Sequence, residues 1–150
     1  MSGMKFREIK ENKKQFLSLL LLADEQEIMI DRYLEKGTMY VLDDNGVKAE
    51  CVVTDEGDGI LEIKNIATVP EYQGKGYAKA LIDFLVNEYA YKYSVLQVGT
   101  GDSPLTVPFY EKCGFVRSHI IPNFFTNNYD HPIFECGVKL TDMVIFQRNL

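Results

Sequence analysis

Gln73-Gly74-Lys75-Gly76-Tyr77-Ala78 is the stretch that decides the fold of this chain. Its two glycines let the main chain come close to a bulky anion. The helix expected behind them offers unpaired N–H groups and a partial positive charge at its start. This combination predicts a phosphate-binding loop built from main chain, although two glycines would also ease a plain strand-to-helix turn.

Two other glycine-rich phosphate motifs do not fit this loop. The dinucleotide-binding fingerprint needs a third glycine where this chain has Lys79. The nucleoside-triphosphate loop needs Gly-Lys followed by Ser or Thr, and the sequence contains no such tripeptide. The loop therefore belongs to neither of these nucleotide-binding motifs.

The elements on either side of the loop form a crossover unit. An extended run, Ile60 to Val69, precedes the loop, and a short strand, Val95 to Val98, follows the helix. The helix itself is predicted from apolar residues at helical spacing, namely Ala78, Leu81, Ile82, Leu85 and Tyr89. Strand, helix and strand in this order predict two neighbouring parallel strands.

The N-terminal part of the chain predicts two helices and an antiparallel meander. One helix is expected from Lys13 to Leu22, and a second runs to Lys36 from a capping box formed by Asp24 and Glu27. Asn45-Gly46 is typical of a tight hairpin turn. Strands are expected at Met4 to Ile9, Thr38 to Leu42 and Val47 to Thr54.

The C-terminal part combines a short helix, Pro108 to Cys113, with two strands, Phe115 to Ile121 and Val138 to Arg148. Between the strands lies an irregular segment, Pro122 to Gly137, and loops of this length are usually functional or disordered. The elements together predict the α+β class. We expect one domain over residues 1–150, with a mixed, mostly antiparallel sheet and helices on both faces.

Charge and composition narrow the function. The net charge of 16 − 22 = −6 argues against a nucleic-acid partner. The longest apolar stretch, Phe16 to Ala23, is too short to span a bilayer, and the N-terminus lacks the apolar region of a secretory signal. The three cysteines form no Cys-x-x-Cys pair. We therefore expect no membrane partner, no bound metal, and free thiols in a reducing cytoplasm.

Three stretches of the chain resemble the GNAT superfamily of N-acetyltransferases. Gln73 to Ala78 matches the motif Q/R-x-x-G-x-G/A, with the permitted alanine in last place. The lead-in, Ile66 to Tyr72, is similar to the family's L-x-V-x-P-E-Y, and Tyr110 to Phe115 resembles its Y-x-x-x-G-F motif. The matched motifs cover residues 60 to 117, and the order of elements agrees over the whole chain.

The resemblance implies acetyl-CoA as co-substrate. Backbone groups of Ile66, Ala67 and Thr68 would pair with its pantetheine arm, and the N–H groups from Gln73 to Ala78 would hold its pyrophosphate. Asp102 departs from the family, whose members often carry Asn there, because a carboxylate cannot donate a hydrogen bond. Asp102 stays a candidate cofactor residue, with helix capping or amine binding as the alternatives.

The resemblance also implies direct transfer of the acetyl group to a primary amine. Tyr110 matches the tyrosine that protonates the leaving thiolate, a task that suits a phenol because it is protonated at neutral pH. Glu62 stands eleven residues before Gln73, where the histone-acetylating branch has its general base. A solvated carboxylate beside Lys64 is the alternative for Glu62.

The irregular segment near the C-terminus is the expected acceptor site, because it mixes aromatic and polar side chains as small-molecule pockets do. The candidate residues are Phe125, Tyr129, His131 and Glu135. This segment resembles one found in a small bacterial subgroup of the superfamily, and its alternative role is a lid packed over the core. The expected partner is a small-molecule or peptide amine, with a second copy in a homodimer as a further option.

Two other functions remain open from the sequence. The first is a CoA-binding sensor or regulatory module without turnover, which would use the same loop. The second is an interaction domain that binds a partner chain at its sheet edge, with Gly74 and Gly76 purely structural.

Overall fold

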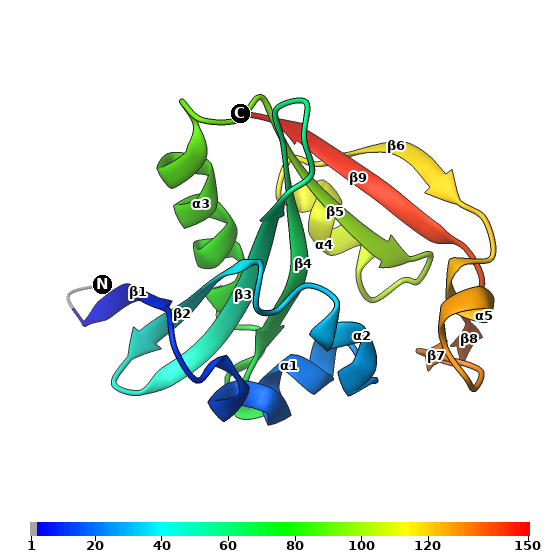
Figure 1. Ribbon diagram of the computed structural model, residues 1–150, viewed down its shortest axis with the longest axis horizontal. Coiled ribbons are helices and arrows are strands. Elements are labelled where there is room, and N and C mark those ends of the chain that lie inside the picture. The colour runs from blue at the N-terminus through cyan, green and yellow to red at the C-terminus, as the bar shows by residue number, and fades with distance from the viewer. Residues whose placement is uncertain (1–2) are drawn as a thin grey trace.

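A computed structural model describes residues 3–150 of the chain. Its centre is a seven-stranded sheet in the order β1-β2-β3-β4-β5-β9-β6, and β7 and β8 form a separate hairpin (Figure 1). The strands are β1 (Met4–Ile9), β2 (Thr38–Asp44), β3 (Val47–Asp55), β4 (Ile60–Thr68), β5 (Val95–Gly101), β6 (Val116–Ile121), β7 (Phe134–Glu135), β8 (Val138–Lys139) and β9 (Met143–Asn149). Among the strands of residues 3–150, only β4 and β5 pair in parallel, so the predicted mixed, mostly antiparallel α+β sheet is confirmed.

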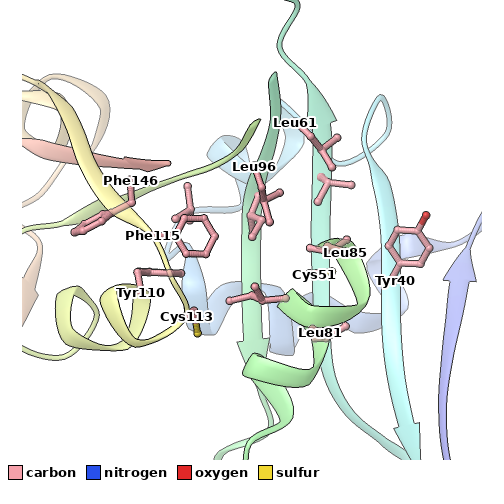
Figure 2. Packing of buried hydrophobic residues seen from close by; sticks show 14 of the residues in the cluster. Tyr40, Cys51, Leu61, Leu81, Leu85, Leu96, Tyr110, Cys113, Phe115 and Phe146 are labelled. Atoms are coloured by element: carbon pink, nitrogen blue, oxygen red, sulfur yellow. The ribbon is translucent and has the colours of Figure 1, made fainter. Parts of the chain in front are cut away.

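Helices cover both faces of this sheet. They are α1 (Leu17–Ala23), α2 (Glu27–Asp31), α3 (Tyr77–Tyr89), α4 (Val107–Lys112) and α5 (Phe124–Asn128), with 3-10 turns η1 (Lys13–Phe16) and η2 (Pro70–Tyr72). On one face, α1 and α2 bury Leu20 and Ile30 against the sheet. On the other face, Leu81 and Leu85 of α3 and Tyr110 of α4 join a single apolar cluster (Figure 2). Within residues 3–150, no helix is long and apolar enough to cross a membrane.

Local sequence explains the meander. Asn45 and Gly46 connect β2 to β3 with φ values of 56° and 109°, and such a pair of positive angles is what a tight hairpin turn of this kind requires. The hairpin predicted at this dipeptide is therefore confirmed.

Three expected elements differ in the structure. The first helix begins as the 3-10 turn η1 and continues as α1. The second helix ends at Asp31 and not at Lys36. Its capping box is also wrong, because Gln26 occupies the N-cap of α2 while Asp24 lies in extended chain before it. The last predicted strand is two strands, β8 and β9, because Leu140 between them turns back to donate its N–H to the Ile133 carbonyl at 2.8 Å.

Buried Lys13 ties the N-terminal helices to the sheet. Its Nζ donates to the carbonyl oxygens of Leu34, Glu35 and Gly37 at 2.9, 3.2 and 2.7 Å. These carbonyls follow α2, where a helix end leaves acceptors without helical partners. The ammonium group therefore satisfies the turn and is itself satisfied, which removes most of the cost of burying it.

Candidate active site

The glycine loop is open on its outer side. Gly74 and Gly76 have φ values of 78° and 89°, which other residues adopt only under strain. A Cβ atom on either glycine would meet no neighbouring atom within 4 Å, so a bulky group has room there. Lys48 and Lys75 place Nζ 4.2 and 5.5 Å from the centre of the Tyr72 ring. With the start of α3, these ammonium groups fit a pyrophosphate.

Two side chains anchor this loop to the sheet. Gln73 Nε2 donates to the Thr68 carbonyl at 3.3 Å, and the Tyr77 hydroxyl donates to Asp44 Oδ2 at 2.7 Å. Ala78 is half-buried in the first turn of α3. The loop therefore has a fixed position relative to the end of β4.

The parallel strands β4 and β5 separate before they reach the loop (Figure 1). They share four register pairs, from Ile60 with Val95 to Ile63 with Val98. This pairing confirms the predicted crossover unit. After the last pair, β5 continues along β9 as far as Gly101, while β4 stays with β3.

A β-bulge in β4 coincides with the separation. Lys64 is the extra residue, and beyond it Ile66, Ala67 and Thr68 remain paired with β3 on one edge only. Their other edge has no strand partner in the described residues. Free main-chain groups of this kind can pair with an amide-bearing ligand, so the edge fits a pantetheine arm.

The separation opens into a cavity of about 720 Å³. Six of the residues expected at the site line it, namely Glu62, Ile66, Tyr110, Phe125, Tyr129 and Glu135. The other expected residues do not line it, namely Ala67, Thr68, Gln73 to Ala78, Asp102 and His131. Both candidate catalytic residues and three of the four candidate acceptor residues thus line the same cavity. The phosphate loop lies outside that cavity.

Tyr110 projects from α4 into the core beside Phe115 and Phe146 (Figure 2). Its ring is buried, and its hydroxyl makes no hydrogen bond to the described part of the chain. Burial raises the pKa of the Tyr110 phenol above its ordinary value, and the nearby Cys113 and Glu135 add to the rise. The phenol is therefore protonated at neutral pH and available as a proton donor to the cavity.

Glu62 is fixed by two neighbours on the cavity side of the sheet. Lys64 Nζ lies 2.6 Å from its Oε2, and Gln97 Nε2 donates to its Oε1 at 2.6 Å. Gln147 in turn donates to Gln97 at 2.7 Å, which fixes the orientation of that amide. The Glu62 side chain is only 13 % exposed, so its carboxylate is fixed by Lys64 and Gln97 and is not freely solvated.

Asp102 lies apart from the cavity. Its Oδ1 accepts a hydrogen bond from Arg117 at 3.2 Å, and both side chains are exposed. The alternative in which Asp102 caps the following helix is wrong, because Thr106 occupies the N-cap of α4 and no side chain caps it.

The acceptor segment is more ordered than its sequence suggested. Phe125 lies in α5, and its ring stacks on Tyr129 with centroids 5.8 Å apart. Glu135 accepts a hydrogen bond from Ser103 at 2.9 Å. His131 is exposed beside Asp130 and Glu25, whose carboxylates raise its pKa. His131 therefore lies at the outer rim of the cavity, next to Glu25.

Sequence reasoning missed one carboxylate of the cavity. Asp24 accepts hydrogen bonds from the hydroxyls of Tyr33 at 3.1 Å and Tyr129 at 2.7 Å. The buried Asn65 donates to the Tyr33 hydroxyl at 3.0 Å, and all four residues line the cavity. Local spacing to Glu27 favours a helix cap at Asp24. The sequence gives no sign of its partner Tyr129, which is 105 residues away in the chain.

An open glycine loop at a helix start, a gap between parallel strands and a buried phenol at the end of that gap define an acyl-CoA-dependent transferase. Comparison with known proteins agrees with this class. A family model described as the acetyltransferase (GNAT) domain matches residues 35–117. An uncharacterized N-acetyltransferase of Bacillus subtilis, YvbK, is 33% identical over 138 residues, covering 90% of this chain and 89% of that protein.

Two solved structures are similar over the whole chain. A GNAT family acetyltransferase from Elizabethkingia anophelis with acetyl-CoA bound is 31% identical, with a TM-score of 0.93 and 100% of both chains covered. An IAA acetyltransferase from Bacillus cereus is 35% identical, with a TM-score of 0.90 and coverage of 98% and 99%. The chain belongs to the GNAT acetyltransferase family, and the predicted activity, N-acetyl transfer from acetyl-CoA, is confirmed. The alternative of a binding module without turnover is not supported.

Proposed function

We propose that this enzyme moves the acetyl group directly from acetyl-CoA to a primary amine of a small molecule or peptide, with Tyr110 as general acid and Glu62 as general base. The observation that carries the proposal is the buried phenol of Tyr110, which lines the cavity where β4 and β5 separate. Acetyl-CoA supplies the acetyl thioester. The chain's own residues hold this donor, orient it and manage two protons.

The donor would be held mainly by main chain. The N–H groups from Gln73 to Ala78 and the lysines near Tyr72 suit the pyrophosphate, and the free edge of β4 at Ile66, Ala67 and Thr68 suits the pantetheine arm. Asp102 contributes to the donor only if its pair with Arg117 opens. Binding of acetyl-CoA through main-chain groups needs few specific side chains.

Two protons must move during the reaction. The attacking amine loses one, and Glu62 is the carboxylate on the cavity side of β4 that would receive it while Lys64 balances its charge. The departing thiolate gains the other, and the Tyr110 phenol holds it ready. Phe125, Tyr129, His131 and Glu135 would form the acceptor end of the site.

Replacing Tyr110 with Phe tests this proposal, because it removes the hydroxyl and keeps the ring in its apolar cluster. We expect turnover to fall by about 10²-fold while acetyl-CoA affinity, measured by calorimetry, stays the same. Tyr93→Phe is the matched control, since the Tyr93 hydroxyl bonds Asp55 outside the cavity. Equal loss of turnover and donor binding in Tyr110→Phe would make Tyr110 a packing residue.

We also propose that the enzyme works in the cytoplasm. Support comes from the three cysteines, all unpaired, with Cys51 and Cys113 buried and Cys136 exposed. The homodimer stays a prediction, and sedimentation velocity is the measurement that tests it.

A further inference from the structure

Asp24 occupies a built site at the acceptor end of the cavity. It lies in the extended link between α1 and α2, and each of its carboxylate oxygens accepts a hydrogen bond from a different tyrosine. Tyr33 is fixed in turn by Asn65, which is 3 % exposed and also donates to the Leu20 carbonyl. The carboxylate therefore has one orientation, fixed before any ligand arrives.

Asp24 also has no direct ion-pair partner among residues 3–150. Glu62 pairs with Lys64, and Glu25 lies 3.5 Å from His131, whereas Asp24 forms no ion pair within residues 3–150. Its hydrogen bonds come from the two tyrosine hydroxyls and from the main chain at Gln26, all neutral groups. Partial burial raises the pKa of Asp24, because the loss of hydration outweighs its hydrogen bonds and the charge of Arg32, which forms no ion pair with Asp24.

Tyr129 connects this carboxylate to an aromatic wall. Its hydroxyl bonds Asp24 while its ring stacks on Phe125, and Phe125 packs against Phe124 with centroids 5.3 Å apart. Exposed apolar side chains continue the wall, with Ile121 and Phe134 40% and 60% exposed along the cavity. A cation at Asp24 would thus have an apolar surface directly beside it.

We propose that Asp24 binds the ammonium group of the acceptor and that the acceptor is a primary amine carried on an aromatic or aliphatic body. The inference rests on the proposed acetyl transfer and names its substrate class. The ammonium group of the acceptor forms the ion pair that Asp24 lacks. The aromatic or aliphatic body of the acceptor packs on Phe125 and Phe124. A polyamine fits less well, because most other carboxylates of the cavity already have cationic partners.

The experiment compares 2-phenylethylamine with spermidine as acceptors for the wild-type enzyme, Asp24→Asn and Asp31→Asn. Asp24→Asn keeps the shape of the side chain and removes its charge. We expect KM for 2-phenylethylamine to rise by about 10- to 100-fold in Asp24→Asn, with KM for acetyl-CoA unchanged. Asp31→Asn makes the same change at an exposed carboxylate that pairs with Lys14 outside the cavity, so it should stay within about 2-fold of wild type.

A second variant and a binding measurement keep the test decisive. Tyr129→Phe removes one hydrogen bond to Asp24 and keeps the aromatic wall, so it should raise the same KM by a smaller factor. Calorimetric titration of 2-phenylethylamine into the enzyme with CoA separates binding from chemistry. Binding that depends on Asp24 without turnover would uphold Asp24 and count against the roles of Tyr110 and Glu62. Unchanged acceptor KM in Asp24→Asn, or a preference for spermidine, would overturn the inference.

Discussion

Glu50 carries an energetic cost that can be measured. It lies in the middle of β3 opposite Val41 and Ala67, is 0% exposed, and has no hydrogen-bond partner for either carboxylate oxygen among the described residues. Burial raises its pKa well above the ordinary value of 4.5. The folded protein therefore keeps Glu50 neutral at pH values where the unfolded chain ionises it.

The sign and size of the effect follow from proton linkage. A raised pKa gives stability that is fully present below 4.5 and is lost as the pH rises toward the folded-state pKa of Glu50. Each pH unit in this window lowers the free energy of unfolding by about 1.36 kcal/mol. Two pH units within this window thus cost about 3 kcal/mol, a large part of the stability of a small domain.

Glu50→Gln removes the ionisation and keeps the size of the side chain. Urea unfolding of both proteins at several values between about pH 5 and pH 7 gives the difference in free energy at each pH. We expect the variant to gain about 1.4 kcal/mol relative to wild type for each unit, because other titrating groups cancel in the difference. Glu111→Gln, on the exposed side of α4, is the surface control. Parallel curves for wild type and Glu50→Gln would refute the reasoning.

Two further predictions concern the donor and the base. Gly76→Val should weaken acetyl-CoA binding by at least about 10-fold in calorimetry, because its side chain would fill the open space outside the loop. Gly57→Val is its control for backbone strain, since Gly57 also has a positive φ, 84°, and lies in a turn away from the cavity; similar loss in both would point to strain. Glu62→Gln should lower kcat by about 10²-fold with KM for acetyl-CoA unchanged, and an unchanged kcat in this variant would assign deprotonation to bulk solvent.

The sequence predicted features that depend on local geometry. Local rules predict the turns at Gly74, Gly76 and Asn45-Gly46, because positive φ angles favour glycine and asparagine wherever they occur. The parallel neighbours β4 and β5 followed from the order of elements alone. These features need no knowledge of which distant residues meet.

The features that escaped prediction depend on distant contacts. Asp24 precedes a helix, so local rules favour a cap, yet its hydroxyl partners come from α2's following turn and from the C-terminal segment. Glu50 gave no signal, because both faces of β3 are buried and no alternation marks the polar residue as internal. The division between β8 and β9 depends on the bond from Leu140 to Ile133, which strand propensity does not encode.

The four register pairs shared by β4 and β5 join two half-sheets. One half, from β1 to β4, carries Asp24 through α1 and α2, and the other, with β5, β9 and β6, carries Tyr110 and Tyr129. The hydrogen bond from Tyr129 to Asp24 links the two half-sheets across the open side of the cavity. A ligand bound to Asp24 is therefore supported from both sides, because Tyr33 reaches the carboxylate from one half-sheet and Tyr129 from the other.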